Sequence, residues 1–597
     1  MKTLVTTASK DIWREDNNVI FLGEWCKQYN EKANWNSKDN DTLPYHWDDK
    51  QKLSKDYDYL GDLYEVILSK LSFKLNEIHD VEFTQRYWRI VLGPWLSSYV
   101  AAVWDRWENI NKAIALKEPM KTIIPDDSQT TRVVANNYLS AIRIMASSDN
   151  WNYLLYCSIL RWQNNSNITL VEKPVDSLEV VSPHNAPELS KSLLYKIVKL
   201  IDFALNKLWF TGEYQCVLYK SFLSPISLLK LSLRLRQPIR IFSEFEREVE
   251  YSNVTSGHRS DKSWFRVKGD FEEFLCQQIN KDIPRAYLED FENIRNILKG
   301  VNYTSKAKLI MTANAHYHNE ILKVWTAGMV EQGSRLIIAA HGGAMRSKFD
   351  TFGHEEDISD YKTTWHEPVH TKHIQLSPNK FISKNIYSGK GENITLIGLD
   401  TYRYANRFPT GPISSTFLVD FRQKVEFIKL VKEIGLKNLV VRPYANPWGW
   451  ASRERYSDEF GQEIISNIKS VKKELLNSKI VICSYPQSTF SEAMHIGVPT
   501  LLMYVEKTWT LHDNFLPLLE EMRRVGIFHA SAESAAAHIK KIHEDPLKWW
   551  NEEDTKTVRL LFDRICGTPA KDIKIDKEWG EFFTKILDQS RTITIEP

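Results

Sequence analysis

The chain has 597 residues, of which 43% are hydrophobic and 26% are charged, and its formal net charge is +2. This length suffices for two or more globular domains, and so small a net charge does not favour a polyanionic partner such as nucleic acid. No apolar run approaches the roughly 20 residues of a membrane span, and charged residues interrupt the N-terminal segment early, so we expect a cytoplasmic protein.

The N-terminal stretch predicts a strand followed by a long helical region. The first apolar, β-branched run ends in Thr6 and Thr7, at the end of a strand where open α/β sheets place their ligands. From residue 48 to about 116, apolar residues recur every three or four positions, as in amphipathic helices. Arg86 and Arg89 lie one helical turn apart here and could grip a carboxylate or phosphate together. A solvated charged face is the plainer interpretation of this pair.

Strands and helices alternate through the rest of the chain. Apolar or β-branched runs bounded by turn formers predict strands at 215–220, 239–243, 308–312, 335–340, 394–397, 438–441, 480–483 and 498–505. Helical spacing occurs at 189–208, 225–235, 418–434, 515–525 and 532–542, and the tail is mostly helical. This alternation indicates parallel sheets.

Histidines follow two of the predicted strands. His316 and His318 come after the strand at 308–312, but no third ligand accompanies them, and the six cysteines show no paired spacing, so we predict no metal site. Asn314 at a helix start explains this segment more simply. The strand at 335–340 runs into His341, Gly342 and Gly343, where two glycines let the backbone approach a ligand closely.

The most informative segment follows the strand at 480–483. Thr489 and Glu492 have the spacing of a capping box, which predicts a helix that begins near Phe490. A helix start at the carboxyl end of a parallel strand presents free N–H groups and a partial positive charge, which suit a phosphate. The hydroxyls of Ser488, Thr489 and Ser491 would add donors. The plainer alternative is that Thr489 and Glu492 only cap the helix.

These motifs resemble known families. Ser-Thr-x-x-Glu-Ala at 488–493, followed by Gly-x-Pro and an apolar strand, resembles the nucleotide-phosphate segment of GT-B glycosyltransferases. The first strand, the segment 85–96 and the His-Gly-Gly loop, with its downstream acidic residues and Trp365, resemble a family of transferases of bacterial surface-polysaccharide gene clusters, typified by a Leptospira protein. This second resemblance extends over nearly the whole chain.

The resemblance implies an α/β, GT-B-like fold with two Rossmann-like domains facing a cleft and helical additions in the N-terminal half. We expect an acceptor-side domain at 1–370 with a helical insertion at about 48–187. A nucleotide-sugar-binding domain would follow at 371–545. A helical tail at 546–597 would then cross back to the first domain.

The implied function is metal-independent glycosyl transfer in O-antigen or capsule synthesis, from a nucleotide-sugar to a glycan or lipid-linked glycan, without a further cofactor. Relatives that use CMP-activated sialic, pseudaminic or Kdo-type sugars make such a donor our first expectation. A neutral nucleotide-sugar, transfer of a polyol phosphate and a non-catalytic glycan-binding scaffold remain as alternatives. Peripheral association with the cytoplasmic face of the inner membrane would fit each of them.

The resemblance also assigns roles to residues. The candidate bases are His341, Asp360 and Glu355. The candidate donor-binding residues are Gly342, Gly343, Arg442, Tyr444, Gln487, Ser488, Thr489, Ser491 and Glu492. Further substrate contacts would come from Thr6, Thr7, Asn314, Arg403 and Arg86. Arg442 or Arg403 would pair with a phosphate or with the carboxylate of an acidic sugar.

Overall fold

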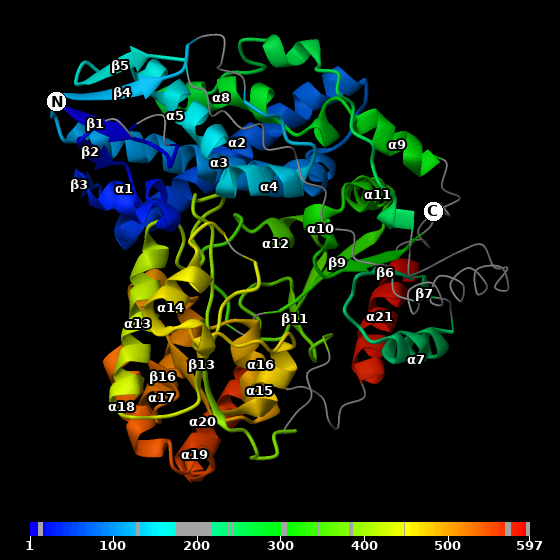
Figure 1. Ribbon diagram of the computed structural model, residues 1–597. Helices are drawn as coiled ribbons and strands as arrows, with labels where there is room; N and C mark the ends of the chain where they lie inside the picture. The colour runs from blue at the N-terminus through cyan, green and yellow to red at the C-terminus, as the bar shows by residue number, and fades with distance from the viewer. Residues whose placement is uncertain are drawn as a thin grey trace.

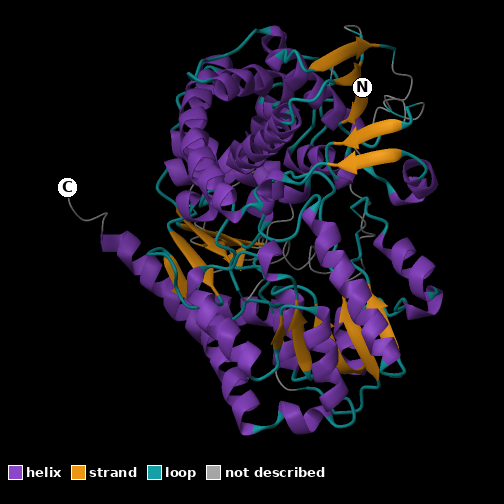
Figure 2. Ribbon diagram, turned by 90° about the vertical axis from the view of Figure 1, so that its left-hand side faces the viewer, coloured by secondary structure: helices purple, strands orange, loops and turns teal. Residues whose placement is uncertain are grey.

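The computed structural model describes residues 1–9, 13, 16–126, 132–174, 216–236, 239–240, 244–299, 307–342, 345–380, 386–446, 448–567 and 575–592. Within these ranges the named strands form three sheets, and all their pairings are parallel (Figure 1, Figure 2). The expected α/β class with parallel sheets is therefore confirmed. The helix predicted at 189–208 and Gly343 lie outside the described residues.

The first sheet belongs to an N-terminal unit of its own. Its strand order is β3-β2-β1-β4-β5. The strands are β1 (Lys2–Val5), β2 (Asn18–Phe21), β3 (Asp39–Thr42), β4 (Met120–Ile124) and β5 (Ile168–Glu172). The expectation from the sequence places β1 in the same domain as the strands after residue 215 and makes residues 48–187 a helical insertion in that domain. The structure differs, because β4 and β5 lie within that stretch and extend the sheet of β1.

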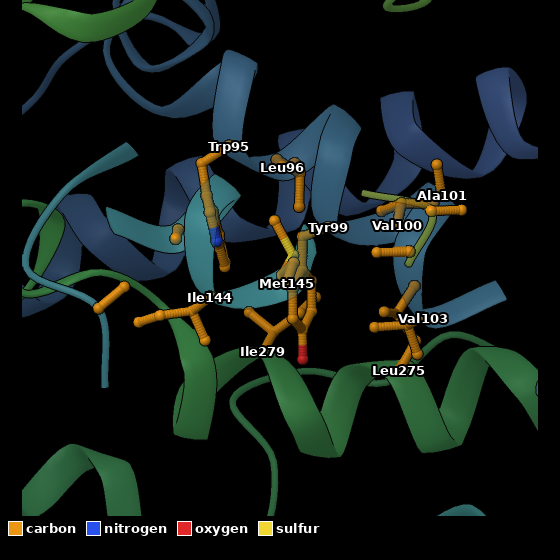
Figure 3. Packing of buried hydrophobic residues seen from close by; sticks show 14 of the residues in the cluster. Trp95, Leu96, Tyr99, Val100, Ala101, Val103, Ile144, Met145, Leu275 and Ile279 are labelled. Carbon is orange, nitrogen blue, oxygen red and sulfur yellow. The ribbon is translucent and has the colours of Figure 1, made fainter. Parts of the chain in front are cut away.

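Long helices fill the N-terminal unit. They include α2 (Lys50–His79), α3 (Gln85–Ala115), α4 (Tyr138–Ser147), α5 (Asp149–Gln163) and α8 (Asp270–Asp282). Apolar side chains occur all round α3, as expected for a buried helix, and α3 packs against the other four. Figure 3 shows Trp95 and Tyr99 of α3 close to Met145 of α4 and Ile279 of α8. Since α3 also contacts α11 (Glu320–Glu331), this core continues into the second sheet.

The second sheet has the order β11-β10-β9-β8-β6-β7. Its strands are β6 (Cys216–Tyr219), β7 (Ile239–Arg240), β8 (Leu309–Thr312), β9 (Arg335–Ala339), β10 (Tyr361–Thr364) and β11 (His373–Gln375). The crossover helix α7 (Pro225–Leu235) has the predicted bounds, with its proline in the first turn. The C-terminal helix α21 (Ile575–Thr592) packs on α7 and buries Trp579 and Phe583 beside this sheet.

The third sheet has the order β13-β12-β14-β15-β16. Its strands are β12 (Asn393–Ile397), β13 (Leu439–Arg442), β14 (Ser478–Cys483), β15 (Thr500–Met503) and β16 (Phe528–His529). Helices α13 (Thr416–Glu433), α16 (Ser488–Ile496), α17 (Leu516–Arg524), α18 (Ala532–Ile542), α19 (Pro546–Trp550) and α20 (Glu553–Cys566) complete this unit.

The second and third sheets share one winding pattern. In each, the first strand lies between the second and the third, so the connections change side beside it. Ligands of open α/β sheets bind at the carboxyl ends of the strands at this switch point. Helix α16 starts at the switch point of the third sheet, directly after β14. The two sheets and the returning tail give the expected GT-B-like arrangement, to which the N-terminal unit is added.

Candidate active site

A cavity of about 350 Å³ lies between the second and third sheets. The second-sheet side contributes His341, Gly342, Glu355 and Lys362, and the third-sheet side contributes Arg407, Thr410, Gln487 and Ser488. A smaller cavity of about 140 Å³ adjoins it and is lined by Asp400, Tyr444 and Trp448. Arg407, Thr410 and Gln487 line both cavities, so the two form one continuous cleft.

The loop after β9 comes close to the start of α16 at the cleft. His341 is exposed in this loop, and Gly342 follows it. A Cβ atom added to Gly342 would lie 2.3 Å from the Oγ atom of Ser488, far inside van der Waals contact. A glycine is therefore needed for the observed approach of the backbone to the Ser488 hydroxyl. The structure thus brings together His341, Gly342 and Ser488, which the sequence had singled out separately.

Helix α16 begins two residues earlier than predicted. Gln487 occupies the N-cap position and Ser488 is the first helical residue, and the Gln487 side chain makes no capping hydrogen bond. The predicted capping box is wrong, because Thr489 already lies inside the first turn and accepts a hydrogen bond from the Tyr485 hydroxyl at 2.8 Å. A helix start presents first-turn N–H groups that have no partner within the helix itself, and such a start favours an anion.

Two other predicted donor ligands on α16 do not face the cleft. Glu492 forms an ion pair with Lys380 at 2.5 Å, and the Ser491 side chain is fully buried. Neither residue lines the two cavities. The helix therefore offers Gln487, Ser488 and its first-turn backbone to a ligand, rather than the whole motif.

Glu355 is an acidic residue that lines the larger cavity. It lies on α12 (His354–Ile358), where its carboxylate is 2.7 Å from the Lys362 Nζ atom and 3.4 Å from the His316 Nε2 atom. Burial raises the pKa of Glu355, but the Lys362 ammonium and the neighbouring His316 ring outweigh it and hold this pKa well below its usual range. Burial also lowers the pKa of His316. At neutral pH the Glu355 side chain is thus a carboxylate with a fixed cationic partner.

A second group of charged residues adjoins the pair of Glu355 and Lys362, because Lys362 also contacts Glu356. Glu356 accepts from Arg346 at 2.6 Å and from Lys362 at 2.8 Å, and the His373 Nε2 atom lies 2.9 Å away. Arg346 also pairs with Asp350. Both cations of this group therefore already have carboxylate partners.

A family model described as LIC12162 family transferase matches residues 2–572. The chain belongs to the LIC12162 family of transferases. No curated protein matches it. Among solved structures, the chain is similar to the wall teichoic acid polymerase TagF, with 12% identity over 66% of this chain and 97% of that chain and a TM-score of 0.30. The chain is also similar to MurG of Acinetobacter baumannii, with 9% identity over 62% of this chain and 99% of that chain and a TM-score of 0.30. Its similarity to the spinosyn forosaminyltransferase SpnP has 8% identity over 63% of this chain and 100% of that chain, with a TM-score of 0.30.

In this LIC12162-family transferase, Asp360 and Arg86 lie away from the cleft. Asp360 precedes β10, at the amino ends of the strands, where it accepts a hydrogen bond from the Leu336 N–H at 2.8 Å. Its carboxylate pairs with Arg86 and with Arg335, each at 3.1 Å. The structure therefore removes Asp360 from the candidate bases and Arg86 from the substrate contacts, because each is a partner of the other.

The two arginines predicted to hold a phosphate or carboxylate also have other partners. Arg442 pairs with Glu474 at 3.2 Å and donates to the carbonyl of Lys469 at 2.8 Å. Arg403 is 4% exposed and pairs with Asp149 of the N-terminal unit at 2.6 Å. Neither arginine lines the cleft. Both side chains hold loops in place instead.

The remaining predicted contacts divide in the same way. Tyr444 lines the smaller cavity. Thr6 and Thr7 are buried in the N-terminal unit, after a strand of the first sheet. Asn314 is the N-cap residue of α10 (Ala315–His318) and does not line the cleft.

Across the residues that the structure describes, none of the helices combines the length and the apolar composition that a membrane span requires.

Sequence reasoning missed Lys362, Glu356, Arg346 and Arg407. Lys362 lies within a short strand, Arg346 follows the His-Gly-Gly loop by three residues, and Glu356 and Arg407 belong to no motif. A charged residue in a half-buried strand is unusual and was a local signal for Lys362. Their pairing depends on contacts between elements, which the local pattern does not contain.

Proposed function

We propose that this protein is a glycosyltransferase that moves a sugar from a nucleotide-linked donor to a glycan acceptor in the cleft between the second and third sheets. One observation carries the proposal. The start of α16, where the Gln487 side chain makes no capping hydrogen bond, lies so close to the His341–Gly342 loop that a Cβ atom at Gly342 would meet the Ser488 hydroxyl. The helix start that would bind the phosphate and the candidate base His341 therefore border one cavity.

The donor phosphate would bind at the start of α16. Its first-turn N–H groups and the Ser488 hydroxyl would donate to the phosphate oxygens. When the bond to the sugar breaks, the nucleotide leaves as an anion, and donors that are already oriented stabilise the developing charge. The family resemblance supports a metal-independent reaction of this type.

His341 would be the base that takes the proton from the acceptor hydroxyl. It is exposed to the cavity, and histidine is the side chain most often used for this step. Glu355 is the weaker candidate, because a carboxylate whose pKa lies far below its usual range is a poor proton acceptor. Its negative charge would instead stabilise the imidazolium that forms at His341.

For the donor we propose a CMP-linked acidic sugar, on the family resemblance alone. Arg403 and Arg442 no longer support it, since both have protein carboxylate partners. A lipid-linked acceptor of O-antigen or capsule synthesis, reached by peripheral association with the inner membrane, rests on the same resemblance.

Calorimetric titration of the purified chain with CMP, CDP, UDP, GDP and ADP tests the proposal. We expect one nucleotide to bind selectively and its affinity to fall in Ser488→Ala. Selective binding of CMP would support the acidic sugar, and that of CDP a polyol-phosphate donor. Selective UDP or GDP binding would replace both with a neutral nucleotide-sugar. If none of the five nucleotides binds, the proposed glycosyltransferase activity is contradicted and a non-catalytic glycan-binding scaffold is favoured.

A further inference from the structure

Arg407 stands out among the charged residues of the cleft. It lines both cavities and is exposed to them, at their junction with Gln487. Within the described residues no carboxylate lies within ion-pair distance of its guanidinium group. Its carbon atom lies 5.8 Å from the centre of the Tyr402 ring, and its charge also acts on the hydroxyls of Tyr138 and Tyr444. A cation in this position is therefore available to a ligand.

The other cations of the larger cavity are not available in this way. Arg346 pairs with Glu356 and Asp350, and Lys362 pairs with Glu355 and Glu356. Their positive charges are therefore already balanced by the protein. Of the lysines and arginines that line the two cavities, Arg407 is the one without a described carboxylate partner.

The backbone on either side of Arg407 is firmly held. On one side, Arg403 pairs with Asp149 at 2.6 Å and the Tyr404 N–H donates to the Ala146 carbonyl at 3.1 Å, both in the N-terminal unit. The Tyr404 hydroxyl also donates to Asp149, and Arg106 donates to the Ala405 carbonyl.

On the other side, Phe408 is 2% exposed and lies among aromatic rings of the N-terminal and second-sheet units, Trp47, Tyr57, Phe349 and Phe352. The loop thus belongs to the third-sheet unit but is fixed by its neighbours. The loop therefore holds the Arg407 backbone at a defined place beside the cleft. Binding of a ligand would then require little further ordering of this loop, which lowers the entropic cost of binding.

We propose that Arg407 is the cationic group of a phosphate subsite at the junction of the two cavities, where it would bind the donor phosphate together with the start of α16. This inference rests on the proposed function. A guanidinium group binds two phosphate oxygens in parallel and adds a full positive charge to the partial charge of the helix start. Gln487 borders both cavities and immediately precedes α16, so the helix start and Arg407 border the same space. The N-terminal unit then acts as the support that positions this arginine.

The test uses inorganic pyrophosphate, which carries phosphate without a nucleoside. Its affinity is measured by calorimetry for the full chain, for Arg407→Gln and Arg407→Lys, and for Arg422→Gln as a matched control. Arg422 is exposed but lines neither cavity. We expect the affinity to fall at least tenfold in Arg407→Gln, to fall less in Arg407→Lys, and to stay unchanged in Arg422→Gln. Because Arg407 is exposed, the melting temperatures should agree among the variants.

Equal affinity in wild type and Arg407→Gln, or no binding of pyrophosphate by wild type, would overturn the subsite. The nucleotide titration separates this failure from that of the proposed function. If a nucleotide binds and depends on Ser488 but not on Arg407, the proposed function stands and the subsite is wrong. If pyrophosphate binds through Arg407 while no nucleotide binds, the subsite stands and the nucleotide-sugar donor is wrong.

Discussion

Replacing Gly342 by alanine tests the contact between the two halves of the cleft. The added methyl carbon would lie 2.3 Å from the Ser488 Oγ atom but 3.5 Å from the Ser488 Cβ atom, which is ordinary contact. The backbone of Gly342 needs no left-handed conformation, so the strain is relieved by rotation of one hydroxyl. The substitution should therefore displace the Ser488 hydroxyl while leaving the fold intact.

The expected loss follows from that single hydroxyl. A hydrogen bond to a charged group contributes about 1.5 to 3 kcal/mol, so nucleotide affinity should fall about 10- to 150-fold. Ser488→Ala should lose a similar amount, and the double variant should be no worse than either single one, because both remove the same interaction. Gly328→Ala is the control, since nothing lies within 4 Å of a Cβ atom there.

Calorimetry of the four variants, with melting temperatures recorded in parallel, measures both effects. Unchanged nucleotide affinity in Gly342→Ala would refute the reasoning. Fully additive losses in the double variant would also refute it, because the two residues would then act independently.

Three further predictions concern the candidate base His341, the ion pair between Asp149 and Arg403, and the dependence of stability on pH. His341→Ala should lower turnover about 10²-fold or more without changing the melting temperature, whereas the exposed His258→Ala should leave both unchanged; equal turnover would exclude His341 as the base. Asp149→Asn leaves the buried Arg403 without its carboxylate and should cost about 3 kcal/mol, seen as a lower melting temperature; an unchanged value would mean that this contact is not a support. Burial lowers the pKa of His529 from 6.5 to about 4, so between these pH values the unfolded chain binds a proton that the folded chain does not. Stability should then fall as pH drops from 6.5 to 4, less steeply in His529→Gln; equal slopes would contradict this assignment.

The strands and helices could be predicted locally, but their assignment to sheets could not. Helix α7 has the predicted bounds because Pro225 opens it and an apolar stripe runs to its end. β4 and β5 are short, and only their pairing with β1 reveals a separate N-terminal sheet. Strand pairing over more than a hundred residues is a long-range property that local periodicity does not contain.

The candidate site divides along the same line. His341, Gly342 and Ser488 were found because each follows a buried strand, and the carboxyl ends of strands meet at a cleft. The capping box failed because its spacing also fits a helix that has already begun. Arg403 and Arg442 were chosen as free cations, yet each had an acidic partner more than thirty residues away in sequence. Arg407, four residues after Arg403, has none in the described structure, and only the folded chain distinguishes the two.

A structure of the protein with its best-binding nucleotide would test the central claim most directly. The proposal predicts that the phosphate oxygens accept hydrogen bonds from the first-turn N–H groups of α16 and from Ser488, with His341 facing them across the cleft. A nucleotide bound elsewhere would contradict it, for example in the hollow of about 540 Å³ at the other end of α16, between His495 and Arg559. In that case the approach of Gly342 to Ser488 would be a packing contact and not part of an active site.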